Sequence, residues 1–145
     1  MSAAAMPLSR LLQGIAPVPR DVTITDLTLD SRQVDRGAAF LACRGARHHG
    51  LEFAAEVARR GARAILWEPD GRVRPPALDP GIVLAEVPQL SRHASEVADR
   101  FFASPSRALD VIGVTGTNGK TTCAWLLSHA LAACGRPAAY LGTLG

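Results

Sequence analysis

The sequence predicts an α/β protein in two parts. A small α/β domain is expected over residues 1–105, and the first strand–loop–helix–strand unit of a second, P-loop-type domain is expected over residues 106–145. Three observations carry this prediction. Short apolar runs alternate with stretches of helical periodicity. A Ser-Pro-Ser break at 104–106 separates the two parts. A glycine-rich loop at 110–122 then joins a strand pattern to a helix start.

Apolar spacing predicts the first elements of the chain. Leucines at helical spacing predict a short helix over residues 7–13. Alternation over residues 22–29 predicts one or two short strands, which close on the polar trio Asp30-Ser31-Arg32. Such a trio offers a ligand its polar groups at the edge of a sheet. The apolar run 38–43 predicts a buried strand. The next elements are a helix over 51–60 ended by Gly61, a strand over 64–67, an irregular Pro- and Gly-rich loop over 68–81 and a strand over 82–87.

A longer helix follows Pro88 and closes the amino-terminal part. Its predicted buried stripe is Leu90, Ala94, Val97, Ala98 and Phe101, while Arg92, Glu96 and Arg100 are expected to face water. In the second part, strands are predicted over 111–114 and 138–141, parallel to each other and joined by a helix over 121–134. Cys123 and Cys134 fall on the apolar face of that helix, where packing is their expected role.

The loop between Arg44 and Gly50 carries three basic or titratable side chains in a row, Arg47, His48 and His49. This composition suits a binding loop and equally suits a solvated surface loop, and the pattern alone leaves both interpretations open. Two adjacent histidines without a third ligand make a poor metal site.

The glycine-rich loop has the residues of a phosphate-binding turn. Gly116 and Gly119 let successive N–H groups point inward, and the helix that follows adds its positive end. Lys120, which is the single lysine among sixteen basic residues, suits the outer phosphates of a nucleotide, and the Thr121 hydroxyl suits its magnesium ion. The pattern is a variant, since Val114 stands where a P-loop has its first glycine. The alternative is an ordinary glycine-rich turn.

Composition bounds the remaining possibilities. With 145 residues and 48% apolar content, the chain can bury one core, or one domain and part of another. Its net charge of +3 comes from scattered arginines rather than a basic block, so nucleic-acid binding is not favoured. Three cysteines without a pairing motif favour a reducing cytoplasm. Apolar stretches are too short for a signal peptide or a membrane span.

Two blocks of residues resemble the Mur ligase family. The first is Leu-Asp-Ser-Arg at 29–32 with the downstream Gly37, Phe40, Gly45 and Gly50, and the second is Gly-Thr-Asn-Gly-Lys-Thr-Thr at 116–122. The second block is the more specific. It is similar to the loop of the UDP-N-acetylmuramoyl-tripeptide synthetases, the MurE group, whose shorter loop also accounts for Val114. The resemblance covers the amino-terminal part of such a ligase.

This resemblance implies an ATP- and Mg²⁺-dependent ligase of peptidoglycan synthesis. Such an enzyme activates the carboxylate of UDP-MurNAc-L-Ala-D-Glu as an acyl phosphate, which the amine of diaminopimelate or lysine then attacks. The first 105 residues would be the domain that binds UDP-MurNAc. Carried over by position, the UDP-MurNAc peptide would contact Leu29, Ser31, Ala46, Arg47 and His48. ATP would be bound by Gly116, Thr117, Asn118, Gly119, Lys120, Thr121 and Thr122, with Lys120 catalytic and Thr121 a magnesium ligand. The family commonly has Asp at the position of His49.

Several alternatives stay open from sequence. A MurF-type or folylpolyglutamate-type ligase has a related loop, and another P-loop enzyme such as a kinase would need an acidic strand downstream. The chain could also be a non-catalytic UDP-sugar-binding module. The further magnesium ligands, a carbamylated lysine and the amino-acid-selecting domain that the resemblance implies lie outside these residues. The chain alone is therefore expected to show no ligase turnover. The sequence does not indicate an oligomeric state.

Overall fold

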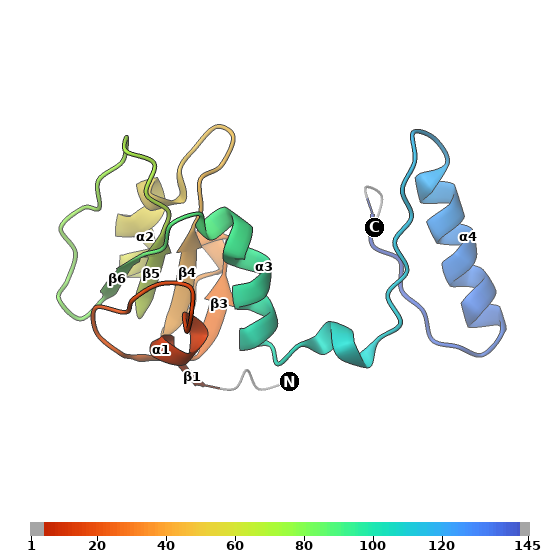
Figure 1. The fold of residues 1–145 in the computed structure, drawn as a ribbon, viewed down its shortest axis with the longest axis horizontal. Coiled ribbons are helices and arrows are strands. Elements are labelled where there is room, and N and C mark those ends of the chain that lie inside the picture. Colours follow the sequence, from red (N-terminus) through yellow and green to blue (C-terminus); the bar gives the residue numbers. More distant parts are fainter. Residues whose placement is uncertain (1–4, 143–145) are drawn as a thin grey trace. The chain divides into compact units, whose positions relative to one another are not determined.

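The computed structural model describes residues 5–142. The chain divides into two compact units, Met1–Pro105 and Ser106–Gly145, which are described separately (Figure 1). The larger unit is an α/β domain with a parallel sheet. The smaller unit contains one long helix.

Four parallel strands form the sheet of the larger unit, in the order β3 (Asp26–Thr28), β4 (Ala38–Ala42), β5 (Ala64–Trp67) and β6 (Val83–Glu86). Because the spatial order follows the chain order, each strand lies beside the next one in sequence. All four strands end at the same edge of the sheet, so the residues that follow them are brought together there. A separate two-stranded antiparallel sheet pairs β1 (Met6–Pro7) with β2 (Thr23–Ile24).

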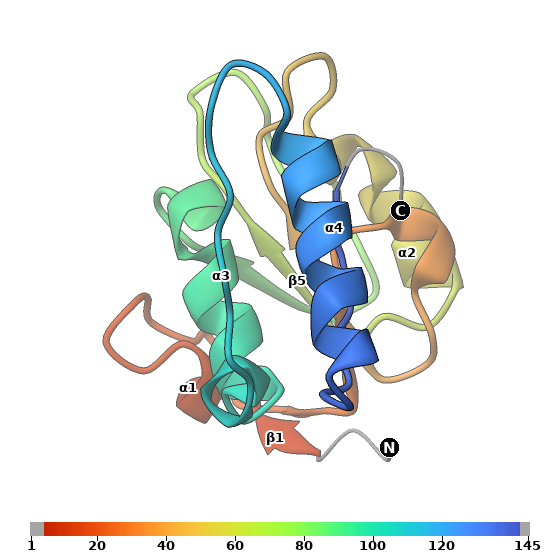
Figure 2. The same cartoon turned by 90° about the vertical axis from the view of Figure 1, so that its right-hand side faces the viewer.

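Alternate residues of the strands enter two cores. In β4, Ala39 and Leu41 pack in one core, whereas Ala38, Phe40 and Ala42 pack in the other. The first core is closed by α1 (Leu8–Leu11) and α3 (Leu90–Phe101), and the second by α2 (Ala54–Arg59). The two helices α3 and α2 therefore cover opposite faces, as Figure 2 shows. This burial on both faces explains why the central strands consist of apolar residues.

Helix α3 has the predicted buried stripe. Leu90, Val97 and Phe101 are buried and the two alanines of the stripe pack against the same core. The prediction that Arg100 faces water holds only in part, because its side chain is 31% exposed and also contacts α1. Its guanidinium donates to the carbonyl oxygens of Leu11, at 3.0 Å, and Gln13, at 2.6 Å. These carbonyls lie at the end of α1, where helix geometry leaves oxygens without a partner, so Arg100 fastens α3 to α1.

Two connections differ from a simple strand–helix alternation. The predicted helix over 51–60 begins as the 3₁₀ helix η2 (Gly50–Phe53) before it continues as α2. Between β5 and β6 the irregular loop over 68–82 covers the sheet in place of a helix, because its Val73 and Leu78 pack against the second core. A further 3₁₀ turn, η1 (Ser31–Gln33), follows β3, and η3 (Pro105–Ala108) lies at the unit boundary.

The smaller unit consists of α4 (Lys120–Ala133) and two extended segments. The expected parallel strands over 111–114 and 138–141 are not formed in the described part of this unit. Val111 is 74% exposed and Ile112 is 60% exposed. A parallel pair is stable only when both faces are covered, and here neither apolar residue is buried. Cys123 and Cys134 are also exposed rather than packed.

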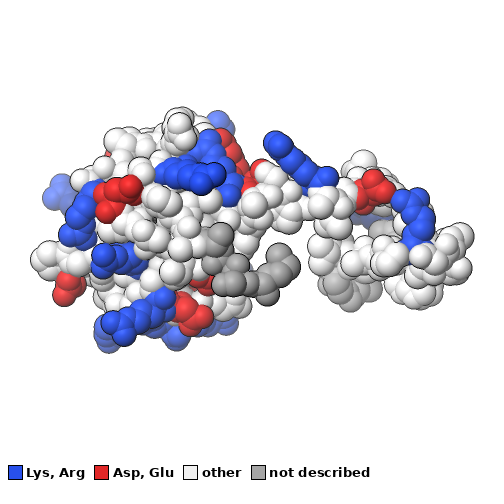
Figure 3. Space-filling view, turned by 90° about the horizontal axis from the view of Figure 1, so that it is seen from below, with Lys and Arg blue, Asp and Glu red and all other residues white. Residues whose placement is uncertain are grey.

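Charged residues of both signs are interspersed on the face seen in Figure 3. Among residues 5–142, no helix combines the length and apolar character that crossing a membrane requires.

Candidate functional site

The candidate site lies at the edge of the larger sheet where the four strands end. Leu29, Cys43, Glu68 and Val87 are the first residues after β3, β4, β5 and β6. In open parallel sheets, ligands bind beyond this carboxyl edge, because the loops that leave the strands present their side chains and backbone groups there. Two neighbouring hollows lie along this edge and share Arg44 and Gly45.

The first hollow has a volume of about 650 Å³ and lies beyond β3 and β4. We call it the apolar hollow because Leu29, Phe40 and Phe53 contribute to its wall. Leu29 is 60% exposed, which is unusual for a leucine beside a buried strand and makes it available to a ligand. Ser31 and His48 line the same hollow, although seventeen positions separate them in the chain. The remaining wall residues are Asp30, Arg32, Leu41, Cys43, Arg44, Gly45, Gly50 and Glu56.

The polar trio at the end of β3 forms a rigid turn at the entrance of this hollow. Asp30 accepts from the Nε of Arg32 at 2.9 Å, from its Nη2 at 2.8 Å and from its backbone N–H at 3.0 Å. These bonds hold the pKa of Asp30 down to about 2. Asp30 is therefore ionised at neutral pH and its charge is matched by Arg32. Ser31 lies between the two, with its hydroxyl in no hydrogen bond within the described residues.

The loop from Arg44 to His49 is closed at its base. Arg44 and His49 form an isolated antiparallel bridge, the Gly45 N–H donates to the His48 carbonyl at 3.0 Å, and the Gly50 N–H donates to the Cys43 carbonyl at 2.9 Å. Both glycines lie against backbone. A Cβ at position 50 would come within 2.6 Å of the Cα of Ala42, and one at position 45 within 2.6 Å of the His48 carbonyl oxygen. Residues 46–48 form the exposed tip between them.

His49 is a structural residue. Its side chain is 5% exposed, its Nδ1 accepts from the Leu51 N–H at 3.0 Å, and its Nε2 lies 2.8 Å from the Glu68 carbonyl oxygen. Because Nδ1 is an acceptor, the proton lies on Nε2, which donates to Glu68. Glu52 completes a capping box by accepting from the His49 N–H at 3.0 Å. His49 therefore starts the η2 helix as an Asp would, and it also ties the loop to the end of β5.

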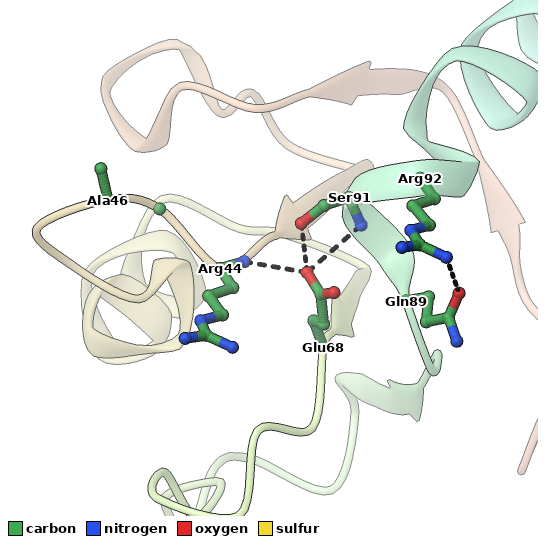
Figure 4. Close-up of a pocket in the computed structure, with 7 residues that line it drawn as sticks. Arg44, Ala46, Glu68, Gln89, Ser91 and Arg92 are labelled. Carbon is green, nitrogen blue, oxygen red and sulfur yellow. Dashed lines mark hydrogen bonds between the residues drawn. The ribbon is translucent and has the colours of Figure 1, made fainter.

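The second hollow, the polar hollow, has a volume of about 620 Å³ and is lined by Arg44, Gly45, Ala46, Glu68, Gln89, Ser91 and Arg92 (Figure 4). Glu68 is its central residue. One oxygen of its carboxylate accepts from the Arg44 N–H at 3.0 Å, from the Ser91 N–H at 3.2 Å and from the Ser91 hydroxyl. These bonds join the base of the loop, the end of β5 and the first turn of α3.

The Glu68 network sets the protonation of two groups. Partial burial opposes ionisation of Glu68, but the Ser91 hydroxyl and the N–H groups of Arg44 and Ser91 outweigh it, so the pKa of Glu68 is lowered. The half-buried thiol of Cys43 lies close by. Its pKa is raised by burial and by the negative charge of Glu68, so Cys43 is a neutral thiol.

The structure brings together three of the five predicted ligand residues of this unit. Leu29, Ser31 and His48 line the apolar hollow. Ala46 lines the polar hollow instead, and Arg47 lines neither of the two. Sequence reasoning missed Arg44, Phe53, Glu68 and Ser91. A glutamate directly after a predicted strand was a usable signal for Glu68, whereas the sequence does not indicate that Ser91 would meet it.

The glycine-rich loop of the smaller unit leads directly into a helix. Gly116 and Gly119 have φ values of 149° and 75°, and α4 begins at Lys120. The N–H groups of residues 117–122 donate no backbone hydrogen bond within the described residues. Lys120 donates through Nζ to the carbonyl of Gly116 and, at 3.3 Å, to that of Thr117. Unpaired N–H groups at a helix start, beside an ammonium, form a donor set that fits an anion such as a phosphate. Among residues 5–142, no group of three or more His, Cys, Asp or Glu side chains could hold a metal ion.

Comparison with curated proteins finds relatives that are named as ligases. The chain is 46% identical over 141 residues to the UDP-N-acetylmuramoyl-L-alanyl-D-glutamate–2,6-diaminopimelate ligase of Xanthomonas campestris pv. campestris, covering 97% of this chain and 28% of the relative. It is 44% identical over 140 residues to the ligase of the same name from Pseudomonas putida, covering 97% of this chain and 27% of the relative. The chain thus spans little more than a quarter of the length of these relatives.

Solved structures show the same fold. A MurF structure from Acinetobacter baumannii matches 92% of this chain and 29% of its own, with a TM-score of 0.63 and 24% identity. MurF ligase from Thermotoga maritima in complex with ADP matches 74% of this chain and 23% of its own, with a TM-score of 0.54 and 30% identity. The model of the Mur ligase family, catalytic domain, matches residues 23–104, which is more than half of the chain and includes both hollows. The chain therefore belongs to the Mur ligase family.

Proposed function

We propose that this chain is the amino-terminal part of an ATP-dependent ligase that adds a diamino acid to UDP-MurNAc-L-Ala-D-Glu in peptidoglycan synthesis. Diaminopimelate is the favoured amino acid, because it is named for the relatives that are 46% and 44% identical. One observation carries the proposal. In a member of the Mur ligase family, residues from two distant segments, Ser31 and His48, line one hollow at the carboxyl edge of the sheet.

The apolar hollow suits the uridine end of such a substrate. Leu29 and Phe53 offer exposed apolar surface to a flat base. The Ser31 hydroxyl is free to donate or accept, and His48 lines the same hollow. Ala46 and Arg47 are proposed to contact the ligand from the neighbouring tip of the loop. The first unit is thus proposed as the UDP-MurNAc-binding domain. We expect the protein to act in the cytoplasm, where Cys43, Cys123 and Cys134 would remain free thiols.

Residues 116–122 are proposed as the ATP site. Backbone N–H groups of Gly116, Thr117, Asn118 and Gly119 would hold the phosphates, Lys120 would place its charge on the outer phosphates, and the Thr121 hydroxyl would ligate Mg²⁺, with Thr122 in the first helical turn. Bound ATP would supply the phosphoryl group that activates the D-glutamate carboxylate. Lys120 would stabilise the negative charge that develops during this transfer, so it is the residue proposed as catalytic.

A graft onto a complete relative tests the activity. The chain replaces the matching amino-terminal segment of the Xanthomonas campestris ligase, and phosphate release is measured with ATP and Mg²⁺. Release is expected only when both UDP-MurNAc-L-Ala-D-Glu and diaminopimelate are present. Lys120→Ala should abolish it, while Arg136→Ala, just beyond the far end of the helix that begins at Lys120, should not. Unchanged turnover in the Lys120→Ala graft would refute the role of the loop.

A second candidate is a non-catalytic module that binds a UDP-sugar. It is favoured by one observation, which is that both hollows belong to the unit that has its own two cores. Calorimetry on the 145-residue chain separates the two candidates. Binding of UDP-MurNAc-L-Ala-D-Glu without any binding of ATP would favour the module, whereas binding of both supports the ligase proposal.

A further inference from the structure

We propose that Glu68 is a positioning residue for ligand recognition, which holds the loop from Arg44 to His49 in the shape that presents His48 to the apolar hollow. The inference rests on the proposed function, because the ligand is taken to be UDP-MurNAc-L-Ala-D-Glu. Glu68 lines the polar hollow and is not part of the apolar one. It therefore acts through the loop and not by contact with the ligand.

Both ends of this loop are bonded to Glu68. Its carboxylate accepts from the Arg44 N–H at 3.0 Å, and its backbone carbonyl oxygen accepts from the Nε2 of His49 at 2.8 Å. Arg44 and His49 also form an isolated bridge with each other. Because Glu68 is the first residue after β5, an inner strand of the sheet, both ends of the loop are attached to a rigid element.

The hydrogen bonds continue from the base of the loop to its tip. Gly45 follows Arg44 directly, and its N–H donates to the His48 carbonyl oxygen at 3.0 Å. The placement of Arg44 therefore constrains His48, which lines the apolar hollow. His48 also has its Nδ1 at 3.3 Å from a Glu52 oxygen, but their side chains are 70% and 51% exposed. A pair that is so exposed to solvent contributes little to holding the tip.

The bonded oxygen of Glu68 also connects the loop to α3. This one atom accepts from the Ser91 N–H at 3.2 Å and from the Ser91 hydroxyl in addition to the Arg44 N–H (Figure 4). The second oxygen of Glu68 accepts no hydrogen bond from the residues that the structure describes. Positioning needs the bonded oxygen, whereas a direct contact with a ligand would use the open one.

Two substitutions of Glu68 separate positioning from direct contact. In Glu68→Gln, the three donors require an acceptor at the bonded position, so the amide oxygen takes that place and the NH₂ group replaces the open oxygen. Positioning is then retained, and a contact that needs the open carboxylate oxygen is lost. Glu68→Ala removes the bonded oxygen too. It frees the Arg44 end of the loop, while the backbone carbonyl still accepts from His49.

Calorimetric titration of the 145-residue chain with UDP-MurNAc-L-Ala-D-Glu measures the effect on recognition. Glu68→Ala is expected to weaken binding by about three- to tenfold, because the loop must then be ordered when the ligand binds. Glu68→Gln should bind as the wild type does. The matched control is Glu86→Ala, an exposed glutamate that is paired in register with Trp67 at the end of the neighbouring strand, and it should change nothing.

Nitrogen-15 relaxation of the unliganded chain measures the order of the loop without any ligand. A loss of global stability alone does not change the backbone order parameters of a chain that is still folded. In Glu68→Ala, the order parameters of Gly45 and His48 should fall from about 0.85, typical of rigid backbone, to below about 0.6. They should return to the wild-type value in Glu68→Gln. The order parameter of Leu66, within β5, should stay unchanged in both variants.

The possible results separate this inference from the proposed function. If the wild type binds the UDP-linked dipeptide and Glu68→Ala binds it equally tightly, the positioning role is overturned and the proposed site stands. If Glu68→Gln recovers the order parameters but not the affinity, Glu68 contacts the ligand directly and positioning is again overturned. If the wild type does not bind the dipeptide, both proposals fail.

Melting curves show whether each variant is folded at the temperature of the titration. If Glu68→Ala is not folded, Ser91→Ala takes its place, because it removes the hydroxyl that helps to hold the Glu68 carboxylate while the Ser91 N–H remains. The expected weakening of dipeptide binding is then about twofold. Unchanged affinity in Ser91→Ala would overturn the positioning role in that case.

Discussion

The two loops that stand out in the sequence are held in shape in different ways. The loop from Arg44 to His49 is fixed by bonds to distant elements, since Glu68 lies 24 residues from Arg44 and 19 residues from His49. The loop before α4 is shaped by its own residues, through the conformations of Gly116 and Gly119 and the bonds from Lys120 to carbonyls three and four positions away. One loop therefore depends on its domain, and the other depends on its local sequence.

The contrast between local and distant contacts explains which features could be predicted from the sequence. A local loop can be recognised from residue types at fixed spacing, so the glycine turn before a helix that begins at Lys120 was predictable, while its binding of phosphate stays a prediction. The strands β4, β5 and β6 and the stripe of α3 were predictable for a related reason, because apolar periodicity records which face is buried. Leu29, Ser31 and His48 were assigned through the family resemblance, and their shared hollow follows from the parallel order of strands.

The remaining features depend on contacts that have no local signature. The contact of Glu68 with Ser91 and Arg44 forms because β5 ends beside α3. The residues next to Glu68 in the sequence do not indicate that contact. The prediction of paired strands at 111–114 and 138–141 failed for the opposite reason. Their apolar pattern is genuine, but a parallel ladder also needs cover on both faces, which Val111 and Ile112 do not have within the described residues.

Hydrogen exchange gives the largest expected contrast between the loops. The N–H groups of Arg44, Gly50 and Leu51 have acceptors in the structure, whereas those of residues 117–119 have no backbone acceptor within the described part. The first group should exchange at least about a hundredfold more slowly than the second. The extended segment 111–114 should exchange as fast as residues 117–119. Slow exchange throughout 111–119 in a dilute sample would contradict the comparison.

Removal of the Glu68 carboxylate should destabilise the larger unit, which contains the loop from Arg44 to His49, and should leave the loop before α4 unchanged. Glu68→Ala removes the acceptor of three hydrogen bonds and should lower the free energy of unfolding of the larger unit by about 2–3 kcal/mol. Urea unfolding is followed through Trp67 in a Trp125→Phe background. Glu86→Ala, an exposed glutamate at the end of β6, is the control and should change the free energy by less than about 0.5 kcal/mol.

Substitution of His49 should have a smaller effect that depends on the replacement. His49→Ala loses the helix cap and the bond to the Glu68 carbonyl, and should destabilise the larger unit by about 1–2 kcal/mol. His49→Asp keeps an acceptor for the Leu51 N–H and should recover about half of that. His48→Ala, with an exposed side chain, serves as the control. If Asp and Ala destabilise equally, the cap does not contribute.

The smallest expected effect is on the pH dependence of stability. Because folding lowers the pKa of Glu68, its contribution is fully present above the unfolded value, near 4.5, and is lost as the pH falls through the folded pKa. Between pH 6 and pH 3, Glu68→Gln should therefore lose less stability than the wild type. The difference should stay below about 1 kcal/mol, since solvent screens a partly exposed carboxylate. Urea midpoints across this range, with Glu86→Gln as control, measure it.

Gly45 and Gly50 close the base of the loop from Arg44 to His49, so the side chains at its tip can be replaced independently of the base. Gly50 lies against Ala42 and Gly45 against the His48 carbonyl, so neither position accepts a side chain without moving backbone. Residues 46–48, which lie between Gly45 and the capping His49, are exposed. Their replacement does not change any residue of the sheet. If the tip contacts the ligand as proposed, exchange of these three exposed side chains would change ligand preference with little effect on the stability of the sheet. Libraries confined to positions 46–48 would sample recognition while the scaffold stays constant.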